Sequence, residues 1–484
     1  MNLRKALIII VGINLVRLAF LPFMGMMPQD AYYYFYSEHL SLSYFDHPPM
    51  VAYMLYLFSL IFGKTVFAVK FADFIITLGT QLAFFTLSSK IIRSDRKYIT
   101  WVLLSSTMLI SSLSVVTTPD VPLLFFWTLS LLTLYIAIFE KKRWFWIWAG
   151  ICMGLAFDSK YTALALPGGL FLFLIFSKRY RYHLATIFPY LAAILMILFT
   201  YPVIRWNIDN HFASFAFQSS ERAETISGIT IENFLGLVGT QFFLLLPIVF
   251  IGLWWVMFRY FGRIFKKPNQ VNPEIWFLIS FFVPMFIGFY MLSFFLWVKL
   301  NWLMPTYISG LILFGIFINE KWLKWHYAWS IALHVVMMVE IIWYVFPVKS
   351  DDTWYGWESL SEQALEVQKQ YPESFIFSSD TYKTTAQLMF FTDQKIYGKN
   401  ILGEHALHYS YIGDDLSLLK GKNAIFIDSH RRFPNDLKSG EKIPKLLNYF
   451  DSYTELEPIL IKRDGKTVRK FCVYYCTDYK GTGS

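Results

Sequence analysis

Ionisable side chains with the potential to catalyse group transfer lie in short segments between long apolar runs of this 484-residue chain. Asp30 precedes a run of tyrosines, Asp46 and His47 precede a double proline, and Asp120 lies between two prolines. Lys160 follows Asp158 by two residues between two apolar runs. Ionisable groups at membrane depth are functional candidates by default, because burying them costs free energy. These residues predict acid–base catalysis or binding of a charged substrate.

Each of these residues also has a purely structural interpretation. Asp120 could cap a helix, since aspartate is a favoured residue at helix starts. Asp158 and Lys160 could form an ion pair that caps two short helices. Asp46 and His47 are harder to explain in this way, because the following prolines fix the direction of the chain. A rigid Asp-His pair suits a metal site or a general base.

A second group of side chains is expected to contact a substrate. Isolated cations in several loops could converge on one phosphate, since Arg and Lys bind phosphate by charge-assisted hydrogen bonds. Each cation alone could equally anchor a helix at the membrane interface. Tyrosines near Asp30 and Asp46 could form the wall of a sugar site or anchor the chain at the interface. The candidates are Arg205, His211, Arg222, Lys299, Tyr33 and Tyr44.

The elements that must position these residues are membrane helices. Hydrophobic residues make up 56% of the chain and charged residues only 16%, and the mean hydropathy is +0.44. This composition excludes a cytosolic enzyme, a disordered regulator and a secreted disulfide scaffold. Apolar runs near the ~20 residues needed to cross a bilayer predict 11 crossings. The runs are 5–23, 66–89, 98–116, 121–139, 144–157, 161–176, 184–203, 234–258, 274–297, 301–318 and 326–346.

Charge distribution predicts the orientation of the chain. Residues 1–348 hold 25 Lys and Arg against 15 Asp and Glu, and most of these cations lie in alternate connections. Positive connections are cytoplasmic as a rule, so we expect a cytoplasmic N-terminus and an outer C-terminus. The alternation holds only if the apolar segment 50–62 lies along the outer interface. The basic surplus is therefore a topological signal, and nucleic acid is not an expected partner.

The C-terminal part has a different character. Residues 349–484 are polar and nearly balanced in charge, with strand-like runs at 375–378, 424–428 and 471–475. They predict a soluble α/β domain outside the membrane, next to a transmembrane domain of residues 1–348 whose catalytic loops are 24–65 and 204–233. Cys472 and Cys476 are four residues apart on an expected strand. This spacing puts their Cα atoms ~13 Å apart, which is too far for a disulfide unless the chain bends.

Five sequence features in order resemble a known enzyme class. They are an Asp-x-Tyr-Tyr segment at 30–33, Phe-Asp-His-Pro-Pro at 45–49, Thr-Pro-Asp at 118–120, the Lys160 turn, and Lys-x-Asn-Trp-x-x-Pro at 299–305. Together they resemble the polytopic glycosyltransferases of the GT-C class. The similarity is to the bacterial branch related to protein O-mannosyltransferases and the lipid A aminoarabinose transferase, and it covers about residues 1–346.

The resemblance implies a role for each matching residue. Asp30 matches a carboxylate that acts as a base or positions the acceptor, and Asp120 matches a loop acid needed for activity. Lys160 matches a lysine near the donor phosphate. Asp46 and His47 stand where the aminoarabinose transferase has Glu-Lys, whose Glu contributes to a metal site. This departure removes one expected phosphate cation and offers a metal ligand instead. Arg205, Arg222 and His211 correspond only by loop position.

The predicted function is transfer of a sugar from a polyprenyl-phosphate donor to an envelope acceptor at the periplasmic face of a bacterial inner membrane, with inversion. Lipid A or another glycolipid is the preferred acceptor. The expected partners are the lipid-linked donor, this acceptor and membrane lipids. A divalent metal is a possible cofactor, and no nucleotide cofactor is expected. The alternatives are a protein O-glycosyltransferase, a lipid or sugar transporter or flippase, and a structural membrane protein that recruits partners.

Overall fold

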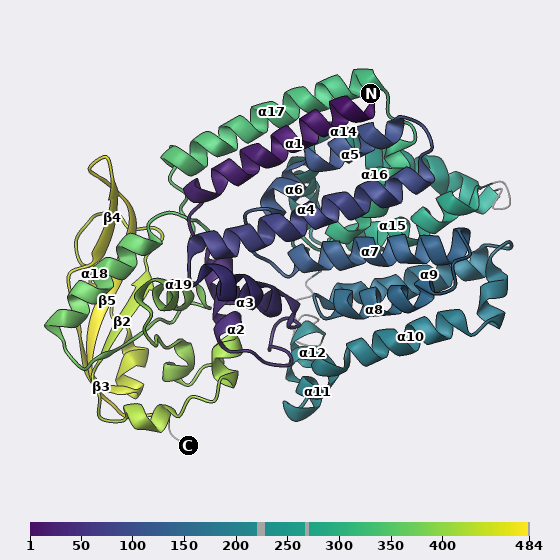
Figure 1. Cartoon of the computed structure of the whole chain (residues 1–484). Helices are drawn as coiled ribbons and strands as arrows, with labels where there is room; N and C mark the ends of the chain where they lie inside the picture. The colour runs from purple at the N-terminus through teal and green to yellow at the C-terminus, as the bar shows by residue number, and fades with distance from the viewer. Residues whose placement is uncertain (220–227, 267–270, 483–484) are drawn as a thin grey trace. The chain divides into compact units, whose positions relative to one another are not determined.

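The computed structural model of the chain describes residues 1–219, 228–266 and 271–482 (Figure 1). The chain divides into two compact units. The first unit contains Met1–Leu21, Leu42–Gly63 and Phe67–Met338, and the second contains Pro22–Ser41, Lys64–Val66 and Val339–Ser484. Part of the first long loop therefore groups with the C-terminal residues.

The first unit is helical. Its α-helices are α1 (Leu3–Phe20), α3 (Met50–Phe62), α4 (Val66–Ile91), α5 (Arg96–Ser105), α6 (Met108–Leu113), α7 (Asp120–Phe139), α8 (Phe145–Phe157), α9 (Ala165–Phe176), α10 (Phe188–Phe199), α11 (Tyr201–Asp209), α12 (Ala213–Gln218), α14 (Ile231–Lys266), α15 (Pro273–Leu292), α16 (Met304–Gly315) and α17 (Glu320–Trp343). Short 3-10 helices are η1 (Leu21–Phe23), η2 (Tyr161–Leu164) and η3 (Arg181–Ala185). In Figure 1, α1 and α17 run side by side, and α8 lies between α7 and α10.

Among the described residues, six helices are long and apolar enough to cross a membrane: α1 with η1, α4, α7, α14, α15 and α17. Six of the eleven predicted runs correspond to these helices. The run 184–203 falls on the bent pair α10 and α11, which meet at 46°. The runs 144–157, 161–176 and 301–318 fall on shorter apolar helices, and so does the segment 50–62.

The run 98–116 is broken rather than continuous. It forms α5 and α6, which are separated at Ser106 and Thr107. The Thr107 hydroxyl accepts a hydrogen bond from the Ile110 backbone N–H at 3.5 Å, so Thr107 caps a new helix. Hydroxyl side chains at such positions satisfy helix N–H groups that have no partner within the helix. Hydropathy does not register this break because the residues around it are apolar.

The second unit is an α/β domain. Its helices are α2 (Pro28–Glu38), α18 (Trp357–Gln370) and α19 (Lys383–Thr392), with the 3-10 helices η5 (Lys399–Leu402), η6 (Leu407–Tyr411), η7 (Leu416–Leu419) and η8 (Pro444–Asn448). Its strands are β1 (Phe375–Phe377), β2 (Ala424–Ser429), β3 (Phe450–Glu455), β4 (Ile459–Arg463) and β5 (Lys466–Tyr479). They form one sheet in the order β1-β2-β5-β3, and β4 also pairs with β5.

The sheet confirms the predicted C-terminal α/β domain. The strand-like runs at 375–378, 424–428 and 471–475 fall on β1, β2 and β5. β1 is parallel to β2, and the other pairs are antiparallel. Cys472 and Cys476 on β5 are buried free thiols, as the strand geometry predicted. Their side chains belong to the core of aromatic and aliphatic residues on one face of this sheet.

Candidate functional site

A buried cluster in the first unit joins three of the predicted motifs. Asp120 is the first residue of α7, Lys160 directly precedes η2, and Asn301 precedes α16. The Lys160 Nζ atom donates to both carboxylate oxygens of Asp120 at 2.8 Å. The Asn301 side-chain N–H donates to Asp120 Oδ2 at 2.6 Å. Residues 181 positions apart in the chain therefore meet at one carboxylate.

The Asp120 carboxylate contacts side chains from other segments rather than capping its own helix. Its side chain is fully buried and that of Lys160 is nearly so, with 8% exposed. Opposite charges attract strongly where water is excluded, and the α7 N-terminus also favours a carboxylate. The N-cap position of α7 is occupied by Pro119, and the structure describes no side-chain cap hydrogen bond there. Asp120 therefore belongs to a tertiary cluster that is stabilised by its ion pair with Lys160.

The Lys160 ammonium retains hydrogen-bonding capacity. An ammonium has three N–H donors, and within the described part of the chain the hydrogen bonds of this one go to Asp120 alone. A third donor is therefore available for an oxygen of a bound substrate. Charge-assisted bonds from such a donor to phosphate are about twice as strong as neutral ones. The site can hold an anionic group beside a carboxylate that keeps the lysine in place.

Backbone and side-chain hydrogen bonds tie the neighbouring loops together. The Met50 N–H, which follows the double proline, donates to the Asp158 carbonyl at 2.9 Å. The Gln218 side chain donates to the Asp46 carbonyl at 2.5 Å. The Tyr161 and Ser214 hydroxyls share a hydrogen bond of 2.7 Å. The loop containing Asp46, the Lys160 turn and α12 therefore form one connected polar region.

Asp158 is a buried acid in this region. Only 5% of the residue is exposed, and burial raises the pKa of its carboxyl from 3.8 to about 8. Within the described ranges, its Oδ1 atom has no hydrogen-bond partner. A carboxyl in such surroundings is protonated at neutral pH and can act as a hydrogen-bond donor.

The predicted loop cations are placed differently from Lys160. Arg205 forms an ion pair of 2.8 Å with Asp209 one turn later on α11, and about half of its side chain is exposed. His211 is exposed and has a positive φ of 53° between α11 and α12. Lys299 is also exposed. Arg222 lies outside the described residues. Among the described contacts, none connects Arg205 or His211 with the Asp120 cluster.

Asp30 and Tyr33 lie on α2 in the second unit. Asp30 is fully buried, and its Oδ2 atom accepts the Met27 backbone N–H at 2.7 Å. With Pro28 as the first helical residue, this contact defines the start of α2. Tyr33 is 7% exposed, and its ring packs edge-on against that of Tyr36 with centroids 5.6 Å apart.

Tyr44, Asp46 and His47 lie in the first unit. Tyr44 is fully buried, and its N–H donates to the His47 carbonyl at 3.2 Å, which closes the turn before the prolines. Asp46 is 7% exposed. Within the described part of the chain, no group of three His, Cys, Asp or Glu side chains is placed to hold a metal ion. Asp46 and His47 alone supply too few ligands for a closed metal site.

Two residues of this region, Asn301 and Tyr161, had no predicted role. Asn301 stands in the Lys-x-Asn-Trp motif, so its signal was present, but an amide carries no charge to draw attention to it. Tyr161 follows Lys160, and only its tertiary contact with Ser214 distinguishes it from an interfacial residue. Asp158 was a candidate from the sequence, but its burial could be learned only from the fold.

The chain is similar in sequence and in fold to known membrane glycosyltransferases. Residues 46–206 match the family described as dolichyl-phosphate-mannose-protein mannosyltransferase. The lipid A galacturonosyltransferase RgtD of Rhizobium johnstonii is 24% identical over 329 residues, which is 67% of each chain. The fold matches apo ArnT from Cupriavidus metallidurans with a TM-score of 0.63 and 13% identity over 97% of each chain. An Archaeoglobus fulgidus oligosaccharyltransferase matches with a TM-score of 0.52 and 11% identity, over 87% of this chain and 68% of the other.

The chain is therefore a multi-pass membrane protein with the fold of ArnT, and its sequence is similar to those of membrane glycosyltransferases. These similarities confirm the resemblance to the GT-C class drawn from the sequence.

The Asp120–Lys160 pair should dominate local stability. Removing one partner of a buried ion pair leaves an uncompensated charge and costs about 3–5 kcal/mol. We expect Lys160→Ala to lower the unfolding temperature clearly, measured by thermal unfolding of purified protein in detergent. Arg205→Ala is the matched control, because a half-exposed pair with Asp209 contributes about 1 kcal/mol or less. Equal losses in the two variants would contradict the assignment.

Asp158 should make stability depend on pH. The folded protein retains a proton up to about pH 8 that an unfolded chain releases near pH 4, so this group destabilises the fold increasingly between those values. Asp158→Asn cannot titrate. Its unfolding temperature should rise relative to wild type from about pH 4 to pH 8 and keep a constant difference above that. A difference that does not change with pH would refute this.

Proposed function

We propose that the protein transfers a sugar from a polyprenyl-phosphate donor to lipid A or another envelope glycolipid. The observation that carries the proposal is the buried pairing of Lys160 with Asp120 and Asn301, which presents an ammonium donor next to apolar helices. A lipid-linked phosphate is an anion attached to an apolar tail, so this setting suits it. ArnT has been solved with undecaprenyl phosphate, and RgtD is named for its action on lipid A, which supports the donor and acceptor classes.

The proposed reaction is a single displacement at the anomeric carbon. An acceptor hydroxyl attacks this carbon, and the bond between the carbon and the phosphate oxygen breaks. The hydroxyl proton passes to Asp30, and the electron pair of the broken bond stays on polyprenyl phosphate. One displacement inverts the anomeric configuration. Lys160 stabilises the charge on the leaving phosphate, while Asp120 and Asn301 position Lys160.

The remaining predicted residues are assigned to substrate binding in this proposal. Tyr44 and Tyr33 contact the sugar, and the loop cations approach the donor phosphate when substrate is bound. Arg205 would have to exchange its exposed pair with Asp209 for the phosphate, which costs little free energy because exposed pairs are weak. The loop residues concerned are Arg205, His211, Arg222 and Lys299.

The proposed location is the bacterial inner membrane, with the N-terminus in the cytoplasm and the second unit in the periplasm. The distribution of Lys and Arg among the connections supports this orientation. Lipid-linked sugar donors remove the need for a nucleotide cofactor at that face.

Transfer activity tests the proposal directly. Purified protein should transfer sugar from a short-chain polyprenyl-phosphate donor to lipid A. Mass spectrometry of lipid A after the reaction measures this transfer. Asp30→Asn should lower kcat by about 10²–10⁴-fold, the usual contribution of a positioned base. Asp120→Asn and Lys160→Ala should also lose activity, whereas Lys462→Ala, on β4 of the second unit, should not.

The alternatives predict other outcomes. Transfer to serine or threonine of a peptide, with lipid A inert, would favour a protein O-glycosyltransferase. Movement of the donor across vesicle membranes without a new glycosidic bond would favour a flippase. Equal transfer by wild type and Asp30→Asn would remove Asp30 from the mechanism.

A divalent metal held by Asp46 and His47, with water or substrate oxygens as its remaining ligands, is a further proposal, and no step of the reaction above passes through it. Metal analysis of protein purified without chelators checks it. Wild type should retain about one divalent ion per chain more than Asp46→Ala does, because carboxylate and imidazole are common metal ligands. Equal metal content in the two proteins would end this proposal.

A further inference from the structure

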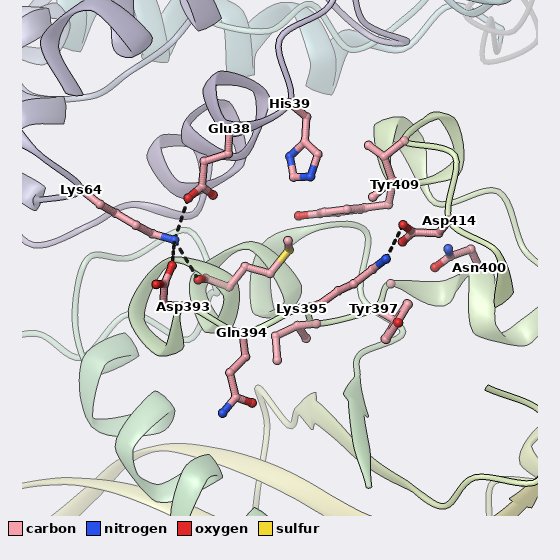
Figure 2. Close-up of a pocket in the computed structure, with 14 residues that line it drawn as sticks. Glu38, His39, Lys64, Asp393, Gln394, Lys395, Tyr397, Asn400, Tyr409 and Asp414 are labelled. Atoms are coloured by element: carbon pink, nitrogen blue, oxygen red, sulfur yellow. Dashed lines mark hydrogen bonds and ion pairs between the residues drawn. The ribbon is translucent and has the colours of Figure 1, made fainter. Parts of the chain in front are cut away.

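The second unit contains a pocket whose lining includes none of the residues assigned to transfer. Its volume is about 280 Å³, and it is lined by the end of α2, by Lys64 and by the segments after α19. Figure 2 shows Glu38 and His39 on one side and Lys395, Tyr397 and Asn400 on another. Binding pockets for drug-sized ligands span about 300–1,000 Å³, so this volume fits a single small ring rather than a chain of sugars.

The charges that line the pocket are paired with one another. Lys64 Nζ lies 2.8 Å from Glu38 Oε1 and 2.8 Å from Asp393 Oδ1. Lys395 Nζ lies 2.5 Å from Asp414 Oδ1 (Figure 2). Two lysines therefore face three carboxylates, a formal charge of −1 with His39 neutral. Such a lining repels an anion, while the carboxylates retain lone pairs that accept hydrogen bonds from hydroxyl groups.

Asn400 presents an acceptor that the fold does not use. Within the described ranges, its buried Oδ1 atom has no hydrogen-bond partner, although the residue lines the pocket. A buried acceptor without a partner in the folded chain points to a ligand that supplies the missing donor. A sugar hydroxyl is such a donor.

Gly398 keeps the space beside this acceptor open. A Cβ atom at this position would lie 3.3 Å from Ala406 Cβ, 3.4 Å from Tyr409 Cδ2 and 3.5 Å from Asn400 Oδ1. The φ of Gly398 is −92°, a value that any residue can adopt, so its backbone does not require glycine. The absence of a side chain therefore leaves room between an aromatic ring and an amide oxygen. Sugar rings offer apolar C–H faces and hydroxyl edges that fit such a pair of surfaces.

We propose that this pocket binds one pyranose ring without an anionic substituent. The paired charges, the unused Asn400 acceptor and the space beside Gly398 together define a ligand rich in hydroxyl groups, uncharged or positively charged. The ring is either a free sugar or a sugar of the acceptor, and the second source rests on the proposed function. The pocket is separate from the Asp120 cluster in its residues and in its role.

Ligand binding by the full chain in lipid nanodiscs tests the site. The probes are methyl β-glucopyranoside, methyl glucosaminide and methyl galacturonide, observed by saturation-transfer NMR. We expect saturable binding of the first two and at least tenfold weaker binding of the anionic third. Asn400→Ala and Gly398→Ala should each weaken binding at least tenfold. Asn448→Ala, an exposed asparagine outside the pocket, is the matched control and should bind like wild type.

Stability separates recognition from folding. The Asn400 side-chain oxygen makes no hydrogen bond among the described residues, so Asn400→Ala should keep the wild-type unfolding temperature while losing the sugar. Three results would overturn the proposal: no saturable binding of either non-anionic probe, equal binding by Asn400→Ala and wild type, or tighter binding of the galacturonide.

Kinetics identify the source of the ring. If it belongs to the acceptor, Asn400→Ala raises the KM for acceptor at least fivefold and leaves kcat unchanged. If it is a free sugar, both constants stay the same while glycoside binding is lost. A fall of kcat to the level of Asp30→Asn would refute a separate site. Normal transfer without glycoside binding defeats this inference alone, and glycoside binding without transfer defeats the proposed function alone.

Discussion

The arrangement of the first unit depends on one buried ion pair. Asp120 begins α7, Lys160 lies between the end of α8 and the start of η2, and Asn301 lies just before α16. Their contacts therefore connect these ends of α7, α8 and α16. Burying two charges is expensive, and the cost is offset only when geometry and hydrogen bonds are good. Both carboxylate oxygens lie at 2.8 Å from the ammonium and a third donor lies at 2.6 Å. The hydrogen bonds that offset the cost of burying the two charges also hold the Lys160 ammonium in one position.

The polar loops around the pair extend this constraint. The Met50 N–H to Asp158 bond connects the double-proline loop to the Lys160 turn, and the bond between Tyr161 and Ser214 connects that turn to α12. Each bond is ordinary in strength, about 1 kcal/mol net. Together they hold the double-proline loop, the Lys160 turn and α12 in one connected polar region.

The sequence predicted the class of fold well because hydropathy and charge are long-range averages. Apolar runs located the helices, and strand-like runs located β1, β2 and β5. It predicted less where one side chain decides the structure, as at Thr107, whose hydroxyl starts a new helix inside an apolar run. Charge identified Asp120 and Lys160 but not Asn301, because partners across 181 residues are chosen by packing. The grouping of α2 with the C-terminal sheet likewise depends on aromatic contacts, such as that of Tyr34 with Phe390, that have no signal in sequence order.

The short helix α8 has a consequence for the surrounding lipid. It has 13 residues, which at 1.5 Å per residue gives a length of about 20 Å against a hydrocarbon core of about 30 Å. A helix shorter than the bilayer thins the membrane around it or leaves its end below the surface. Because α8 ends at Phe157, three residues before Lys160, thinning brings lipid headgroups closer to this lysine. A phosphate among those headgroups would then reach the ammonium while its lipid tail stays in hydrocarbon.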